Sequence, residues 1–307
     1  MSGLDVVAIG EAMVEFNQTR KGEPTYLQGF GGDSSNAVIA AARSGARTAY
    51  VTRVGDDEAG RLLGALWQKE GVDRRGVIVD RKAPTGVYFV HHGPQGHAFS
   101  YLREGSAASR MQPADVPAEL LRGVRIVHAS GISMAISAGA CDTVLAAFEM
   151  ARASGAKISF DSNLRLKLWP LARARALTAA ALGMTDYFFP SFEDACALSG
   201  QMQPGALLDW AHRLGAKTVF LKLGARGAVL SDGTRRERIA PHKVDALDAT
   251  GAGDCFCGAA LARIAAGDDA LAAARYANAA AALSTTGYGA VAPLPAGEAV
   301  RALLARG

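Results

Sequence analysis

The sequence predicts a single α/β domain over residues 1–307, with a central, mostly parallel β-sheet and helices on both faces. Short runs rich in valine, isoleucine and phenylalanine alternate along the chain with longer, alanine-rich stretches of helical character. Strands that alternate with helices form parallel sheets through right-handed crossovers, which place helices on both faces. Half of the 307 residues are hydrophobic, so the chain can bury a large core without disulfides or metal ions.

The expected elements follow in order along the chain. Strands are predicted where short apolar runs are bounded by glycine or polar residues, at 4–10, 48–53, 124–129, 157–160, 186–189 and 218–221. Helices are predicted at 34–44, 58–70, 140–153, 192–199 and 204–214. Gly45 and Gly71 end the first two of these helices, because glycine readily adopts the left-handed conformation that terminates a helix.

Two stretches, residues 12–30 and 76–103, alternate apolar and polar side chains instead. Turns are expected at Gly22, at Gly86 and over residues 93–96. Alternation of this kind predicts half-buried strands, so these pieces are expected to form a small antiparallel sheet beside the main domain. The pattern leaves two interpretations open, a lid over a site or an edge extension of the main sheet.

Charge and cysteine content exclude several classes of protein. The formal net charge of +4 is spread along the chain, and Glu237 interrupts the densest basic cluster, residues 235–238, which favours a solvated turn over a nucleic-acid surface. The four cysteines lack the spacing of a zinc site and are too few for a secreted disulfide scaffold, which favours a reducing cytoplasm. We expect no signal peptide and no membrane span, because the first apolar run is short and no later run is long enough.

The strongest chemical signal is residues 248–254, Asp-Ala-Thr-Gly-Ala-Gly-Asp, which lead directly into an apolar helix. Glycines let the backbone turn tightly, and the start of a helix exposes four unpaired N–H groups. Together they form a site for a phosphate or another developing anion. Asp254, at the helix start, is open to two interpretations: an ordinary cap, or a base that takes a proton from an attacking hydroxyl.

This segment resembles the C-terminal signature of the ribokinase-like (PfkB) carbohydrate kinases, D-T-x-G-A-G-D, with Ala249-Thr250 in the place of T-x. Residues 31–37, Gly-Gly-Asp-Ser-Ser-Asn-Ala, resemble a second signature of that family, and the order and separation of the two match over nearly the whole chain. The resemblance implies a ribokinase-like fold with a small β-sheet lid. It also implies that Asp254 is the catalytic base beside an anion hole formed by Gly251, Ala252 and Gly253, and that the sugar is contacted by Gly32, Asp33 and Asn36.

Three further segments resemble the 2-keto-3-deoxygluconate kinases of that family: residues 101–109 (Y-x-R-x-x-S-A-A-S), residues 128–132, and residues 160–169 (D-x-N-x-R-x-x-L-W). Arg103 and Arg165 lie in two of them, and a guanidinium suits the carboxylate of an acid sugar through its charge and its fork of N–H donors. Each arginine could instead be a surface ion-pair partner.

Tyr88 and Tyr101 combine an apolar ring with a hydroxyl group. They suit one wall of a sugar site, and they equally suit the aromatic core of the lid itself.

Residues 222–228 resemble the K-x-G-x-x-G loop over the ATP phosphates in the same family, although a hairpin turn explains the glycines as well. The resemblance implies ATP contacts from Lys222, Gly224 and Gly227. Ser191-Phe192-Glu193 stands in the place of the N-x-x-E motif, with serine in place of asparagine, which implies that Glu193 binds Mg2+ through water. Further ATP contacts are implied for Asn163, Arg165, Ser191, Gly251, Gly253 and Asn278, and Mg2+ is expected to arrive with the nucleotide.

The sequence therefore predicts an ATP-dependent kinase that phosphorylates 2-keto-3-deoxygluconate at its terminal hydroxyl, giving the 6-phosphate and ADP. A kinase of a neutral sugar such as fructose or ribose is the nearest alternative, and a non-catalytic sugar sensor belongs to a different class. Because an open lid sheet has edges that need cover, a homo-oligomer formed through the lid is expected. A sugar acid and ATP are the expected partners, and neither nucleic acid nor a membrane is expected.

Overall fold

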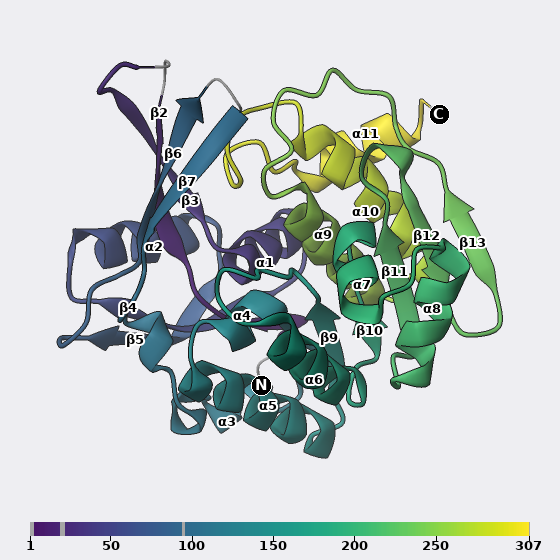
Figure 1. Ribbon diagram of the computed structural model, residues 1–307, viewed down its shortest axis with the longest axis horizontal. Coiled ribbons are helices and arrows are strands. Elements are labelled where there is room, and N and C mark those ends of the chain that lie inside the picture. The colour runs from purple at the N-terminus through teal and green to yellow at the C-terminus, as the bar shows by residue number, and fades with distance from the viewer. Residues whose placement is uncertain (1–2, 19–21, 94–95, 307) are drawn as a thin grey trace.

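The chain folds around a nine-stranded sheet (Figure 1), and this computed structural model describes residues 3–18, 22–93 and 96–306. From one edge to the other the strands are β13 (Arg236–Ile239), β12 (Ala228–Ser231), β11 (Thr218–Lys222), β10 (Tyr187–Phe188), β9 (Lys157–Asp161), β8 (Ile126–Ser130), β1 (Val6–Ile9), β4 (Thr48–Gly55) and β5 (Asp73–Asp80). Neighbouring strands from β5 to β11 pair in parallel, and β12 and β13 continue the sheet as antiparallel strands. The predicted mostly parallel sheet is confirmed.

Helices cover both faces of this sheet, because successive side chains of a strand point to opposite faces. Val6 and Ala8 of β1 belong to one hydrophobic cluster, with α1 (Asp33–Arg43), α2 (Glu58–Lys69), α9 (Ala252–Ala266), α10 (Ala270–Ser284) and α11 (Gly297–Leu304). Val7 and Ile9 belong to the other, with α3 (Ala118–Leu121), α4 (Gly131–Ala135), α5 (Ala138–Ala153), α6 (Leu171–Leu182), α7 (Phe192–Ser199) and α8 (Pro204–Arg213). None of the helices in the described part of the chain is both long and apolar enough to cross a membrane.

A second, smaller sheet stands apart from the large one, at the upper left of Figure 1. Within the described residues its order is β3 (Tyr26–Gly31), β2 (Met13–Gln18), β6 (Val87–Gly93) and β7 (Gly96–Leu102). The β2–β3 and β6–β7 pairs are antiparallel, but β2 and β6 pair in parallel, so the expected antiparallel sheet is in fact mixed. Residues 76–80, which the alternation assigned to the lid, lie instead in β5 at the edge of the large sheet. β5 is a partly exposed edge strand, and it mixes apolar and polar side chains as a lid strand does, so the sequence could not separate the two.

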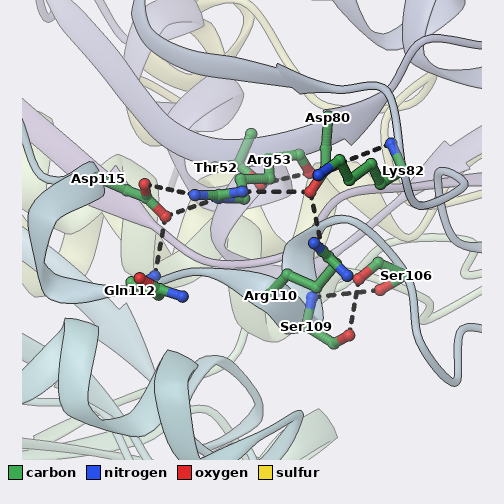
Figure 2. Close-up of polar contacts among 9 residues, drawn as sticks. All are labelled: Thr52, Arg53, Asp80, Lys82, Ser106, Ser109, Arg110, Gln112 and Asp115. Atoms are coloured by element: carbon green, nitrogen blue, oxygen red, sulfur yellow. Dashed lines mark hydrogen bonds and ion pairs between the residues drawn. The ribbon is translucent and has the colours of Figure 1, made fainter.

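The segment that follows β7 is fastened to the carboxyl ends of β4 and β5 (Figure 2). Arg53 donates to Asp115 through Nε and Nη2, at 2.7 Å each, and to Asp80 through Nη1 at 3.1 Å. Nε of Arg110 donates to the same oxygen of Asp80 at 3.0 Å. These charge-assisted bonds fix the base of the small sheet relative to the large one.

Candidate active site

Several parallel strands of the large sheet end at the same edge, and polar residues follow them there. In open α/β sheets this edge is where ligands bind. The residues at or just beyond these strand ends are Glu11 after β1, Ser130 in β8, Asp161 in β9, Ser191 after β10 and Lys222 in β11.

The loop before α9 is folded by the carboxylate of Asp248. Its Oδ1 accepts bonds from the N–H and the hydroxyl of Thr250, at 2.9 and 2.6 Å, and its Oδ2 accepts the N–H of Gly289 at 2.9 Å. Gly251 then caps the helix with φ of 75°, a conformation that favours glycine, and a Cβ there would lie only 3.0 Å from Ala290. The predicted anion-binding residues, Gly251, Ala252 and Gly253, thus form the N-terminal end of a 15-residue helix.

Asp254 lies in the first turn of α9 and is held by a residue from α1. The amide nitrogen of Asn36 donates to Oδ2 of Asp254 at 2.8 Å, across 218 positions of sequence. The two helices approach closely because Gly258 has no side chain, and a Cβ there would overlap the carbonyl oxygen of Ala37. Burial and then the charge of Asp33 raise the pKa of Asp254 to about 8. A carboxylate that titrates near neutral pH, fixed beside an anion site, is suited to accept a hydroxyl proton.

Asp33 begins α1 and faces the same region. Its Oδ1 accepts the N–H of Ser34 at 2.8 Å, and its Oδ2 accepts the side-chain amide of Asn163 at 2.9 Å. Burial raises the pKa of Asp33, and the charge of the exposed Arg165 acts in the opposite direction. Gly32 before it has φ of 110°, and a side chain there would overlap the backbone of Glu11.

Lys222 ends β11 and joins this group through Asp161. Its ammonium lies 2.7 Å from Oδ2 of Asp161, and both side chains are largely buried. Burial acts to lower the pKa of Lys222, but the charge and hydrogen bond of Asp161, together with Cys257 and Asp254, raise this pKa above its ordinary value. A Cβ on Gly253 would lie 3.5 Å from this ammonium, which places a fixed cation beside the first turn of α9.

The expected hairpin between β11 and β12 is present, and the predicted phosphate loop is its turn. Gly224 and Gly227 have φ of 59° and 84°, and a Cβ on Gly227 would overlap the carbonyl oxygen of Ile239. Arg226 lies over the ring of Phe192, with 5.3 Å between the guanidinium and the ring centroid. The glycines therefore serve the turn.

Ser191 and Glu193 occupy the start of α7. The hydroxyl of Ser191 accepts the N–H of Asp194 at 3.0 Å, so Ser191 is a helix cap. Glu193 is exposed, whereas Asp194 accepts the hydroxyl of Ser162 at 2.9 Å and the N–H of Leu164 at 3.1 Å. Burial raises the pKa of Asp194. The N-x-x-E spacing counted from Ser191 ends at Asp194, so the spacing alone was enough to find this residue.

Asn278 in α10 is buried, and its side-chain amide donates to the carbonyl oxygen of Ala240 at 2.8 Å. This bond ties α10 to the segment after β13. The amide nitrogen of Asn278 is thus engaged within the protein, as expected for a residue that packs a helix.

The small sheet presents aromatic side chains toward this region. Tyr88 and Tyr101 stack with 5.6 Å between ring centroids, and Tyr101 remains 42% exposed. The hydroxyl of Tyr88 donates to the buried carboxylate of Glu15, which the sequence analysis did not single out. Burial raises the pKa of Tyr88, and the charges of Glu15 and Asp254 add to this rise. The face that carries these rings is therefore the face near the candidate base.

Arg103 forms an ion pair with the buried carboxylate of Glu11 at the base of the small sheet. The hydroxyl of Ser106 donates to the other oxygen of Glu11 at 2.6 Å. The guanidinium of Arg103 also lies 5.8 Å from the ring centroid of Tyr101. Glu11 follows a strand and a glycine, so its place at a strand end was the signal available in the sequence.

Comparison with known proteins gives consistent matches. The model of the pfkB family carbohydrate kinases matches residues 4–297. A 2-dehydro-3-deoxygluconokinase of Thermoproteus tenax is 37% identical over 265 residues, which cover 83% of this chain and 80% of that protein. Fructokinase-1 of Oryza sativa subsp. japonica is 32% identical over 307 residues, which cover 94% of each. A candidate ribokinase II from E. coli, solved with ATP and Mg2+, has a TM-score of 0.92 at 27% identity, covering 99% of this chain and 100% of that one. The ribokinase-like fold is thereby confirmed.

Proposed function

The chain belongs to the pfkB family of carbohydrate kinases, and on that premise we propose that it transfers the γ-phosphoryl group of ATP to 2-keto-3-deoxygluconate (2-dehydro-3-deoxy-D-gluconate). The acceptor is the terminal hydroxyl, and the products are the 6-phosphate and ADP. The observation that carries the proposal is the carboxylate of Asp254, held by Asn36 at 2.8 Å in the first turn of the helix α9.

Each catalytic group has one task in this reaction. Asp254 accepts the proton of the terminal hydroxyl as the hydroxyl oxygen attacks the γ-phosphorus. The bond from that phosphorus to the bridging oxygen of the β-phosphate breaks, and ADP leaves. The N–H groups of residues 251–253 and the ammonium of Lys222 stabilise the charge on the transferred group.

Magnesium would neutralise phosphate oxygens when it arrives with ATP. In the described part of the chain, no group of three histidine, cysteine, aspartate or glutamate side chains could hold a metal by itself. We assign water-mediated contact to Asp194, which turns inward, in preference to the predicted Glu193, which is exposed.

The acid-sugar assignment depends on Arg103 and Arg165, which supply positive charge on two sides of the candidate site. Arg165 acts on Asp33 electrostatically, and Arg103 stands beside Tyr101 at the base of the small sheet. The similarity to a 2-dehydro-3-deoxygluconokinase supports this choice. Gly32, Asp33, Asn36, Tyr88 and Tyr101 would contact the rest of the sugar.

One observation favours a neutral sugar as the second candidate. The charge of Arg103 is already matched by the buried carboxylate of Glu11, so less of it is available for a substrate carboxylate. The similarity to a fructokinase supports the same alternative.

An ADP-release assay with acid and neutral sugars side by side tests both candidates. For the acid sugar, Arg103→Ala and Arg165→Ala should each raise KM at least 10-fold, because a charged hydrogen bond to the carboxylate is lost. Arg47→Ala is the control, since Arg47 is largely exposed and pairs with Asp5 on the surface. Equal KM values for wild type and both variants would contradict the acid-sugar proposal, and no ADP release with any sugar would favour a sensor.

We assign the small sheet the role of a lid, since it carries aromatic rings near the candidate base and is separate from the large sheet. Closure of this lid would exclude water and limit ATP hydrolysis.

The small sheet also exposes two leucines, Leu27 and Leu102, which are 63% and 65% accessible. Exposed apolar side chains of this kind suit contact with a second copy of the chain, and we propose a homo-oligomer formed through the lid. A monomer mass in solution light scattering would contradict the homo-oligomer.

A further inference from the structure

Asp161, the last residue of β9, is the point where three parts of the site meet, although the sequence analysis gave it no separate role. Its Oδ2 accepts the Lys222 ammonium at 2.7 Å and the thiol of Cys257 at 3.1 Å. Its Oδ1 accepts the backbone N–H of Asn163 at 3.2 Å. Three donors from separate segments therefore fix one buried carboxylate, which is only 4% exposed.

The Oδ2 contacts place the cation at the anion-binding end of α9. Cys257 lies three residues after Asp254, so both occupy the same side of the helix. The thiol of Cys257 is 3.6 Å from the ammonium of Lys222, and a Cβ on Gly253 would lie 3.5 Å from the same ammonium. A lysine side chain has four rotatable carbon–carbon bonds, so its ammonium keeps one position only if a partner holds it. Asp161 is that partner.

The Oδ1 contact holds a strained turn. Asn163 has φ of 25°, in a region that residues with side chains rarely adopt. The bond from its N–H to Asp161 stabilises this conformation, and the turn directs its side-chain amide to Asp33 at 2.9 Å. One carboxylate thus supports both the phosphate side and the sugar side of the site.

We propose that Asp161 is a positioning residue for phosphoryl transfer, holding the Lys222 ammonium at the anion-binding end of α9 with one oxygen and the Asn163 turn with the other. This inference rests on the kinase activity proposed above. It predicts that the two oxygens can be separated by mutation, because an asparagine side chain keeps an acceptor for the turn but has no negative charge for the lysine.

Two variants make this separation. Asp161→Asn should lower kcat about 100-fold, the usual cost of losing one fixed group that stabilises transition-state charge, and leave the sugar KM within about 2-fold. Asp161→Ala should lower kcat similarly and also raise the sugar KM roughly 10-fold, because the turn loses its acceptor. A Cys257→Ser variant, which keeps a donor to Asp161, should stay within about 3-fold of wild type.

Asp186→Asn is the matched control. Asp186 pairs with Lys217 at 2.7 Å and accepts the N–H of Ile158 at 2.9 Å, so it also joins neighbouring strands, but at the opposite end of β9. It should lower the melting temperature and leave kcat unchanged. A general loss of sheet stability is thereby distinguished from a specific effect on transfer.

A double-mutant cycle with Lys222→Met tests whether Asp161 acts through the lysine. In that background, Asp161→Asn should cost less than about 3-fold in kcat, since the ammonium is already gone.

The pH dependence of kcat/KM is a second test of the same proposal. Asp254 is faced by the charges of Asp33, Asp161 and Lys222, so Asp161→Asn should move the acid limb of kcat/KM to lower pH and Lys222→Met to higher pH.

The outcomes separate this proposal from the function itself. A wild-type chain that phosphorylates no sugar refutes the kinase function, whereas an active wild type with a fully active Asp161→Asn variant overturns only the positioning role. The positioning role is also overturned if Asp161→Asn and Lys222→Met lower kcat independently, so that the loss in the double variant is the product of the two single losses. If Asp161→Asn does not fold, the double variant Asp161→Asn/Lys222→Met decides, because it leaves no unpaired buried charge. A kcat of the double variant equal to that of Lys222→Met supports the proposal. A further 10-fold loss of kcat overturns it.

Discussion

Asp254→Asn should remove most of the phosphoryl transfer and at the same time make the folded chain more stable at alkaline pH. The substitution keeps the shape of the side chain and an oxygen that can accept the amide of Asn36. It removes the proton acceptor, which for a general base costs roughly 100- to 10,000-fold in rate, so we expect kcat to fall about 1,000-fold. ATP should still bind, because the backbone amides at the start of α9 are unchanged.

The effect on stability follows from burial of the charge. The pKa of Asp254 is raised from 3.8 to about 8, so the folded state holds this proton over a range of pH in which the unfolded chain has released it. Stability from this group is therefore present at low pH and is lost as the pH rises toward 8. At about 1.36 kcal/mol per unit, the wild-type chain should lose at most about 4 kcal/mol between pH 5 and pH 8, and the asparagine variant should not.

Urea denaturation at pH 5 and pH 8, combined with an ADP-release assay, measures both effects on the same samples. The exposed residue Asp245, in the loop before α9, provides the control substitution Asp245→Asn. We expect the stability advantage of Asp254→Asn to be clearly smaller at pH 5 than at pH 8. Wild-type kcat in the variant, or an advantage of equal size at both pH values, would refute the reasoning.

Three further predictions concern the anion site, the sugar side and the metal. Gly251→Ala should destabilise the fold by about 1–2 kcal/mol, because φ is 75° and the new methyl would lie 3.0 Å from Ala290. Gly253→Ala, in contrast, should keep the melting temperature and lower kcat. Equal melting temperatures for the two variants would contradict this prediction. Glu11→Gln should lower the KM for an acid sugar roughly 10-fold by releasing the charge of Arg103, and an unchanged KM would count against that arginine as the carboxylate site. EDTA should abolish transfer but leave the melting temperature of the nucleotide-free chain unchanged, because Mg2+ is expected to arrive with the nucleotide. A lower melting temperature would reveal a structural metal.

The sequence by itself determined the fold class, the order of most elements and the segment that carries the candidate base. Every strand and helix that was predicted by its residue range in the large domain lies within two residues of its observed position. These elements are specified locally, by apolar periodicity and by glycines at their ends. Residues 171–182 were not predicted as a helix, because an alanine-rich stretch with dispersed arginines shows only a weak apolar stripe.

Only the tertiary structure decided which polar side chains meet. Asn36 reaches Asp254 across 218 positions, Cys257 reaches Asp161 across 96, and Lys222 reaches Asp161 across 61. No local pattern encodes these contacts, because each depends on how separate helices and strands pack against one another. The parallel pairing of β2 with β6 has the same origin, since a strand's own alternation is satisfied by a parallel or an antiparallel neighbour alike.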